Sequence, residues 1–215
     1  MSNSSLVSYT KLSHNCSTRT DKISKITIHH AAVVNASLAG LGNGFANPAA
    51  QASANYGIDC NGNIGMFVEE KNRAWTSSNR DNDNKAVTIE VANSSGAPNW
   101  QVSDKALSAL IDLCVDICKR NGIPRLNFTG DASGNLTMHC YFAATACPGP
   151  YLKSKFGYIA EEVNKRLAPD PKPTTATNGV MYQLVTGSFS VKENADKRVA
   201  ELKAKGFDSF IQIKK

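Results

Sequence analysis

The chain has 215 residues, of which 41% are hydrophobic and 20% charged, and its formal net charge at pH 7 is +6. This length accommodates one domain with a substantial core plus a small appendage, and no apolar run approaches the ~18 residues of a membrane span, which argues against membrane insertion. The excess of Lys and Arg is shared between the long first part of the chain and its C-terminal part, so no concentrated basic stripe indicates nucleic-acid binding.

The N-terminal residues 1–22 are rich in Ser, Thr and Asn and are predicted to run over the surface. The first six residues lack the basic and apolar regions of a secretory signal. We therefore expect a protein that is made in the cytoplasm and meets any target outside the membrane only after release by another route.

Two predicted strands place polar side chains on the face that turns away from the core. In residues 25–30, alternation puts the isoleucines and His30 on one face, and His29 with a threonine on the other. In residues 86–92, the same alternation puts Glu90 opposite the apolar face. A single glutamate in such a strand is typical of the solvent-facing side of an edge strand, but this is also the face on which His29 is expected to project.

The segments between these strands are predicted from turn and loop residues. Residues 35–54 are rich in Ala, Asn and Gly and indicate a loop with at most one short helix. Residues 56–59 and 63–68 flank Cys60-Asn61-Gly62, a turn sequence that predicts a β-hairpin. Residues 72–85 form a predicted polar loop, whose aspartates are expected to be solvated because the glycine and distal glutamate of a calcium loop are absent.

Two helices are predicted after the second strand. Ser103 is a candidate N-cap and Asn121-Gly122 a stop signal, and the apolar residues between them recur at helical spacing. This stripe, which includes Cys114 and Cys118, is expected to pack in the core rather than bind a cofactor. Residues 150–167 carry a second such stripe. Strands that alternate with helices predict an α/β domain with a central mixed sheet flanked by helices.

The segment between those helices carries the most specific signal. His139 and Cys147 stand eight positions apart, and Cys147 opens a Cys-Pro-Gly turn. Neutral imidazole and thiolate both bind zinc, and a catalytic zinc keeps three protein ligands and one open position. The third ligand is expected from the rigid end of the first strand, where His29 is the better candidate because His30 shares the apolar face.

Five short motifs follow one another along this part of the chain. They are Ile28-His29-His30, Tyr56-Gly57-Ile58-Asp59-Cys60-Asn61-Gly62-Asn63-Ile64, Arg73-Ala74-Trp75, Ile89-Glu90 and the segment from His139 to Gly149. Their types and order resemble the zinc N-acetylmuramoyl-L-alanine amidases of the type-2 amidase and peptidoglycan-recognition group. The resemblance implies that family's fold, an amidase domain over residues 1–168, and hydrolysis of the amide bond between N-acetylmuramic acid and L-alanine in peptidoglycan.

The resemblance also implies roles for individual residues. One zinc ion held by His29, His139 and Cys147 polarises the scissile carbonyl and lowers the pKa of water toward about 7. Glu90 takes the proton from the water and passes it to the departing amine. Thr145 stands where the family has a residue that steadies the oxyanion.

Three further residues are candidates for substrate contacts. Tyr56 and Trp75 match positions near the family's groove, although both fit almost as well as ordinary core aromatics. Many members follow the Arg-Ala-Trp motif with a histidine, where this chain has Thr76-Ser77-Ser78-Asn79. Asn79 is therefore the candidate replacement for that contact.

The C-terminal part of the chain is predicted as a linker and a small unit. Residues 169–178 hold three of the eight prolines and predict a semi-extended linker. Residues 179–215 predict a strand (182–189), a helix (191–205) and a strand (207–213), which resemble one half of a SPOR domain, a family that binds peptidoglycan glycan strands. A lone two-stranded sheet is marginal and has open edges. Either two chains complete one sheet, the unit docks on the amidase domain, or it is partly folded; we expect a homodimer.

The preferred function is therefore a peptidoglycan amidase, with a cell-wall-binding unit and no secretory signal, as in a phage endolysin. A host autolysin or sporulation amidase is an alternative setting. A non-catalytic peptidoglycan-recognition module is disfavoured because Cys147, usually lost in binding-only members, is present. A zinc peptidase of another fold would show a helical His-Glu-x-x-His, which the sequence lacks, and an acid beside the metal does not suit a blue-copper site.

Overall fold

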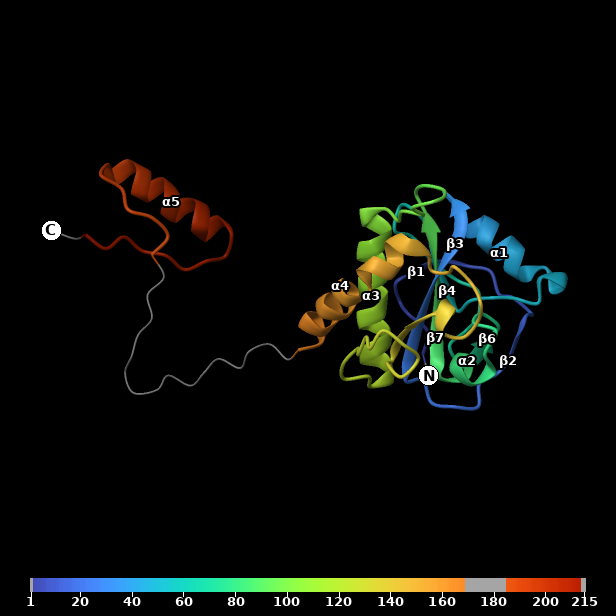
Figure 1. Ribbon diagram of the computed structural model, residues 1–215. Helices are drawn as coiled ribbons and strands as arrows, with labels where there is room; N and C mark the ends of the chain where they lie inside the picture. The colour runs from blue at the N-terminus through green and yellow to red at the C-terminus, as the bar shows by residue number, and fades with distance from the viewer. Residues whose placement is uncertain (1, 169–184, 214–215) are drawn as a thin grey trace. The chain divides into compact units, whose positions relative to one another are not determined.

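The computed structural model describes residues 2–168 and 185–213 of the chain. The chain divides into two compact units, residues 1–170 and 171–215 (Figure 1). The predicted linker, residues 169–178, lies outside the described residues.

A six-stranded sheet runs through the described part of the first unit, in the order β1-β5-β4-β7-β3-β8. Its strands are β1 (Val7–Thr10), β3 (Lys25–Val34), β4 (Tyr56–Ile58), β5 (Ile64–Met66), β7 (Ala86–Asn93) and β8 (Leu136–Met138). Neighbouring strands are parallel except β4 and β5, which form the predicted hairpin. A separate antiparallel pair joins β2 (Cys16–Thr18) to β6 (Asn72–Ala74). The mixed sheet is thus confirmed, but β7 lies in its interior rather than at an edge.

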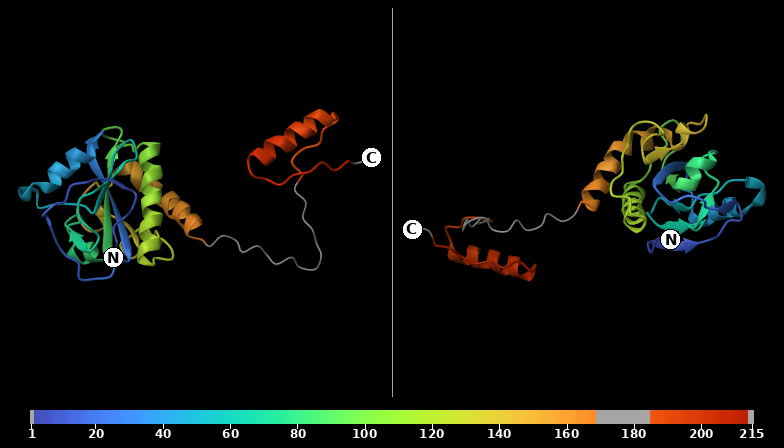
Figure 2. Two further views of the ribbon diagram at one scale, coloured as in Figure 1. Left: turned by 180° about the vertical axis from the view of Figure 1, so that it is seen from behind. Right: turned by 90° about the horizontal axis from the view of Figure 1, so that it is seen from below.

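Helices cover both faces of this sheet (Figures 1 and 2). The long helices α3 (Asp104–Asn121) and α4 (Gly149–Leu167) pack against each other on one face. Helix α1 (Leu38–Ala46) and the short α2 (Arg80–Lys85) lie on the other face. The α/β class predicted from the alternating pattern is therefore confirmed. Between the first strand and the hairpin, where at most one short helix was expected, α1 is followed by a 3-10 turn at Pro48–Ala50.

Helix α3 begins and ends where the sequence predicts. The Ser103 hydroxyl accepts a hydrogen bond from the Ala106 backbone N–H, and Gly122 takes a left-handed conformation with φ +65°. The apolar stripe between these ends, including Cys114 and Cys118, is buried in the main core cluster against the strands. Packing rather than cofactor binding thus accounts for this stripe.

The face of the sheet opposite α3 is polar and yet buried. Thr27, Thr88 and Thr137 expose none of their surface. The Oγ1 atoms of Thr27 and Thr137 lie 2.9 Å apart, and Asn82 Nδ2 on α2 donates to Thr27 Oγ1 at 2.9 Å. Because these groups satisfy one another, their burial is tolerated. A solvent-facing position, the alternative for Glu90, does not describe this face as a whole, because α2 and its flanking loop cover its threonines.

The polar loop predicted over residues 72–85 is more ordered than expected, since it contains β6 and α2. Asp83, predicted to be solvated, is only 2% exposed. Its carboxylate accepts hydrogen bonds from the backbone N–H groups of Thr76 and Ser77 and from the Ser77 hydroxyl. These two backbone N–H groups need a hydrogen-bond partner when they are buried, and the Asp83 carboxylate provides it. This explains why Asp83 is buried.

The second unit contains helix α5 (Lys192–Ala204), close to its predicted bounds. The two flanking strands are not formed among the described residues: 185–191 and 205–213 are irregular. A pair of short strands without further neighbours gains little free energy from pairing, which explains the difference. No side chain among residues 185–213 is buried.

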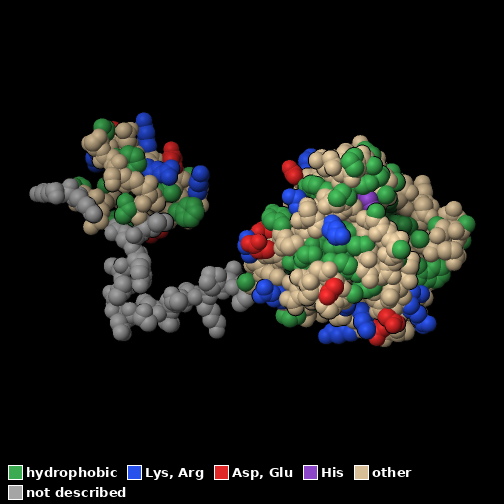
Figure 3. All heavy atoms as spheres, viewed as in Figure 1, with side chains coloured by type: hydrophobic (Ala, Val, Ile, Leu, Met, Phe, Trp, Pro, Cys, Tyr) green, Lys and Arg blue, Asp and Glu red, His purple; other side chains and the backbone are tan. Residues whose placement is uncertain are grey.

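Large apolar side chains are exposed in this second unit, and green atoms mark them in Figure 3. They are Val185, Phe189, Val191, Phe207, Phe210, Ile211 and Ile213. On the face of the first unit drawn in Figure 3, basic and acidic side chains are interspersed. No helix among the described residues is both long and apolar enough to cross a membrane.

Candidate metal centre

Two neighbouring strands in the middle of the sheet place a histidine beside a carboxylate. β3 and β7 pair in parallel with His29 directly opposite Glu90. Side chains of paired residues share a face, so both project onto the polar face, as alternation predicts. His29 is 1% exposed, and its Nδ1 lies 3.9 Å from Glu90 Oε1. Their separation is fixed by the backbone ladder rather than by a loop.

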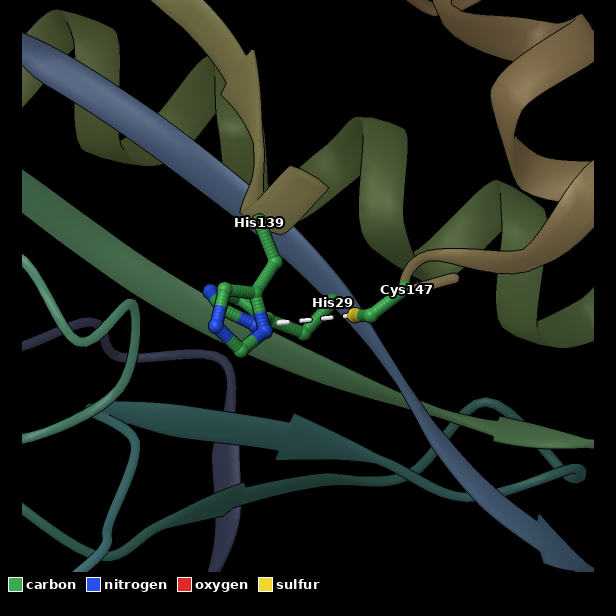
Figure 4. Close-up of side chains that lie close together, drawn as sticks. All are labelled: His29, His139 and Cys147. Carbon is green, nitrogen blue, oxygen red and sulfur yellow. Dashed lines mark hydrogen bonds between the residues drawn. The ribbon is translucent and has the colours of Figure 1, made fainter. Parts of the chain in front are cut away.

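The segment after β8 brings two more groups to the same place. His139 begins a short 3-10 turn at the end of β8, and Cys147 lies two residues before the start of α4. Figure 4 shows His29, His139 and Cys147 converging from three segments. Cys147 Sγ lies 3.7 Å from His29 Nδ1, and the two imidazole centroids are 4.6 Å apart. One potential ligand atom from each residue falls within 4.8 Å of the others.

A zinc ion fits these three groups. With Zn–N near 2.05 Å and Zn–S near 2.3 Å in tetrahedral geometry, a nitrogen and a sulfur ligand stand about 3.6 Å apart, close to the observed 3.7 Å. In addition, His139 Nε2 and Glu90 Oε2 are buried without a hydrogen-bond partner among the described residues. Such orphaned atoms cost about 1–3 kcal/mol each, so a ligand that these atoms contact would stabilise the cluster.

Burial sets the protonation states in the cluster. It lowers the pKa of His29 well below the ordinary value, with smaller contributions from His139 and His30, and it also lowers the pKa of His139. Both imidazoles are therefore neutral, which is the form that binds metals. Burial raises the pKa of Glu90 to about 8 and raises that of Cys147 as well. A divalent cation here favours the ionised forms of both groups.

Thr145 lies beside Cys147 in the loop. It is partly exposed, and its Oγ1 accepts a hydrogen bond from the Cys147 backbone N–H at 3.2 Å. A hydroxyl has one proton to donate besides its two acceptor positions. Thr145 can therefore stabilise the loop and still have a proton to donate.

Trp75 and Asn79 line a common cavity of about 280 Å³, together with Arg73 and Arg80. The Trp75 indole Nε1 donates to the Ser17 hydroxyl at 3.4 Å. Asn79 is the N-cap of α2, so its side-chain oxygen already accepts from the Asn82 backbone N–H. These two residues thus lie together on one side of the α2 segment, but outside the cluster of three ligands.

Tyr56 occupies a different place from the other candidates. In the register of β4 and β7 it pairs with Ile89, not with Glu90, so it projects onto the α3 face. It is fully buried, and its hydroxyl donates to Glu70 Oε1 at 2.7 Å. This position matches the core-aromatic alternative, and a substrate contact by Tyr56 receives no support.

The residues that pack against the Cys-Pro-Gly turn were given no role from the sequence. His30, treated there as a core neighbour, packs against Trp100 and against the glycine of the Cys-Pro-Gly turn. The available signal was the glycine of the turn, since glycine is the residue that allows a positive φ or a close approach; Gly149 has both, with φ +80° and a position against the His30 ring.

The sequence matches two family profiles. The profile described as N-acetylmuramoyl-L-alanine amidase matches residues 19–150, more than half of the chain. A SPOR domain profile matches residues 159–213, so this match begins inside α4, which packs in the first unit. No curated protein matches the sequence.

Solved structures with a similar fold include several cell-wall enzymes. A mutant endolysin from Bacillus subtilis is 17% identical with a TM-score of 0.57, and the alignment covers 72% of this chain and 97% of that one. A selenomethionine AmpD derivative is 17% identical with a TM-score of 0.56, covering 73% and 96%. The Staphylococcus aureus hydrolase AmiA, in complex with its ligand, is 12% identical with a TM-score of 0.59, covering 74% and 82%. At these identities the likeness establishes the fold.

Proposed function

Because the chain belongs to the N-acetylmuramoyl-L-alanine amidase family and so cleaves the amide bond between N-acetylmuramic acid and L-alanine in peptidoglycan, we propose that it does so with zinc held by His29, His139 and Cys147. The observation that carries the proposal is the convergence of one potential ligand atom from each of these residues within 4.8 Å. Beside them, Glu90 Oε2 has no hydrogen-bond partner in the part of the chain that the structure describes. When bound, zinc supplies Lewis-acid chemistry, polarising the scissile carbonyl and lowering the pKa of water.

The protein's own groups carry the proton and the developing charge. Glu90 takes a proton from the attacking water and delivers it to the departing amine of L-alanine. Its position opposite His29 in the β3–β7 ladder supports this role, since it keeps the Glu90 carboxylate 3.9 Å from the imidazole of a proposed zinc ligand. Thr145 donates a hydrogen bond to the oxyanion. The Glu90 side chain is only 15% exposed, and the low dielectric of such surroundings strengthens each interaction.

The cavity beside α2 is proposed as a substrate subsite. Trp75 supplies an apolar ring, and Arg73 and Arg80 supply positive charge that suits the carboxylates of a stem peptide. Asn79 contributes less than the resemblance implies, because its oxygen caps α2. Trp75→Leu is expected to raise KM with the bound zinc unchanged; an unaltered KM would remove the cavity from the substrate path.

The test of the amidase centre compares wild type with two cysteine variants. Cys147→Ser removes a ligand, and Cys140→Ser is the matched control, because its backbone N–H bonds the Cys147 carbonyl while its thiol is not among the three ligands. Zinc per chain is measured together with release of N-terminal alanine and of reducing sugar from purified cell walls.

We expect about one zinc per chain and free alanine without new reducing sugar for wild type and Cys140→Ser. Cys147→Ser is expected to lose both zinc and alanine release. Wild type that binds walls and zinc but frees no alanine would instead favour a recognition module, and the roles of Glu90 and Thr145 would fall with it.

The second unit is proposed to bind peptidoglycan as a SPOR domain and to pair with a second copy of itself. Irregular segments beside α5, no buried side chain in the described part, and exposed phenylalanines such as Phe207 and Phe210 support a unit that needs a partner. A monomeric mass by light scattering at micromolar concentration would contradict the pairing.

The biological setting is proposed to be lysis of a bacterial cell wall, as by a phage endolysin. An amidase with a wall-binding unit suits this task, and a host autolysin is the alternative. Expression with and without a membrane-permeabilising protein separates the two, because an endolysin is expected to lyse cells only after permeabilisation.

A further inference from the structure

The side chain behind the Cys147 ligand is His30, the second histidine of the pair. The alternation of β3 turns it to the face opposite His29, where it is 8% exposed. Its ring meets the indole of Trp100 edge to face, with centroids 5.5 Å apart and planes at 81°. Aromatic pairs favour this arrangement, so the two rings form one rigid surface.

The Cys-Pro-Gly turn lies directly on that surface. A Cβ on Gly149 would approach His30 Cε1 to 3.1 Å, His30 Nδ1 to 3.2 Å and Trp100 Cβ to 3.2 Å. These distances are tighter than ordinary van der Waals contact, so only glycine allows the turn to sit this close. The ring pair thus determines how near the turn, and with it Cys147, comes to β3.

Cys147 itself has contacts on two sides. Its Sγ lies 3.7 Å from His29 Nδ1 on β3, and the Cys140 backbone N–H donates to its carbonyl at 3.1 Å. The His30 ring lies against Gly149, two residues further along the chain.

Trp100 is itself fixed by the end of the strand that carries Glu90. Asn93, the last residue of β7, is fully buried and donates its Nδ2 to the Trp100 carbonyl at 2.9 Å. Trp100 has φ +48°, an uncommon conformation for a residue other than glycine. The hydrogen bond from Asn93 thus attaches Trp100 to the end of β7, next to the loop that carries Cys147.

We propose that His30 and Trp100 are positioning residues that set the place of the Cys147 thiolate, acting through Gly149. The proposal rests on the zinc centre proposed above. Neither side chain touches the three ligand atoms, so their effect is on metal geometry and affinity rather than on the proton steps. Supporting residues of this kind typically change metal affinity by about 10–100-fold.

The test uses the full chain and two readouts besides activity. Zinc affinity is measured by competition with a chromophoric chelator, and the Co(II)-substituted protein is examined for its thiolate-to-metal charge-transfer band and its visible bands. Trp100→Ala and His30→Ala are each expected to weaken zinc binding by about 10–100-fold and to reduce the charge-transfer band, with far-UV circular dichroism unchanged. Because Trp100 is partly exposed, its variant is expected to fold even if the other does not.

A double-mutant cycle identifies the route through the turn. Gly149→Ala alone is expected to weaken zinc binding, whereas in the H30A background, where the ring no longer blocks the added methyl group, it is expected to weaken binding less. Matched controls are Gly157→Ala in α4, where a Cβ meets nothing within 4 Å, and the exposed His14→Ala. Both controls are expected to keep wild-type affinity.

Wild-type zinc affinity and an unchanged cobalt spectrum in both aromatic variants would overturn the proposal. The positioning role would also be overturned if Gly149→Ala reduced zinc affinity by the same factor in the wild-type and H30A backgrounds. A wild-type protein with no thiolate band would instead refute the zinc centre itself, so the two failures are distinguishable.

Discussion

Replacing Glu90 with Gln separates the chemistry from the fold. The carboxyl is buried beside His29, with Oε1 at 3.9 Å from Nδ1 and Oε2 without a partner among the described residues. Glutamine keeps the size and removes the base. Loss of general acid–base catalysis costs about 10²–10⁴-fold in rate, so we expect kcat to fall by that factor while zinc per chain stays at the wild-type value.

The same substitution is expected to stabilise the metal-free protein. Burial raises the pKa of Glu90 from its ordinary 4.5 to about 8, so the folded state binds more protons than the unfolded state between those values. Stability therefore falls as pH rises through this window. A pH of 7 lies about 2.5 pH units above 4.5, within this window of about 3.5 pH units, so the free energy of unfolding of the wild-type protein is about 3 kcal/mol lower there than at low pH. E90Q carries no ionisable group at this position and is expected to keep that free energy.

The assay pairs kcat on purified walls with denaturant unfolding after chelation, at pH 4 and pH 7. Glu69→Gln is the control, since that carboxylate is partly exposed and pairs with Lys71 on the surface. A variant E90Q that retains more than a tenth of wild-type kcat would refute the base assignment. Loss of zinc in E90Q would mean that the carboxylate acts structurally.

Three other substitutions test the remaining assignments. Thr145→Val is expected to lower kcat by about 10²–10³-fold with zinc content intact; an unchanged kcat removes the hydroxyl from the oxyanion site. Arg120→Met leaves the fully buried Glu70 without its guanidinium partner and is expected to cost about 3–5 kcal/mol in urea unfolding, whereas a cost below about 1 kcal/mol would mean that the pair contributes little. Tyr56→Phe loses the hydroxyl bond to Glu70 and is expected to cost about 1.5–3 kcal/mol at pH 7 with kcat/KM unchanged; a changed kcat/KM would return Tyr56 to the substrate site. Because burial raises the pKa of Tyr56 above its ordinary 10, the wild-type advantage over Y56F is present below pH 10 and declines as pH rises above it.

The alternation of side chains along a strand, with its period of two residues, was enough to predict that His29 and Glu90 lie on the same face of the sheet. The register of β3 and β7 then places the two residues opposite each other. The same rule applied to the hairpin would have sent Tyr56 to either face, because the sequence does not give the register between β4 and β7. That register, and not the type of residue, decides that Tyr56 belongs to the core.

What covers the sheet was less predictable. Asp83 and Asn82 occur in a polar stretch whose composition is that of a solvated loop, but their hydrogen bonds to backbone N–H groups and to Thr27 close it over the polar face. Asn82 and Thr27 are 55 residues apart. No helical or strand period indicates the contacts of Asp83 with Thr76 and Ser77, six to seven residues earlier. In the second unit, strand-like sequence on both sides of α5 was insufficient, since strands require neighbours that these described segments do not have.

The order of the site residues along the chain has a consequence for synthesis. His29 and Glu90 lie on strands made early, whereas His139 and Cys147 follow β8, which joins the sheet beside β3 through the pairing of Leu136 with Ile26. At about 5–20 residues per second, a ribosome takes several seconds to pass from the base to the last ligand. With the zinc centre proposed above, a chain truncated before Cys147 is expected to be inert toward the wall. The proposed centre is complete only after the loop that precedes α4 has been synthesised, later than the strands that carry His29 and Glu90.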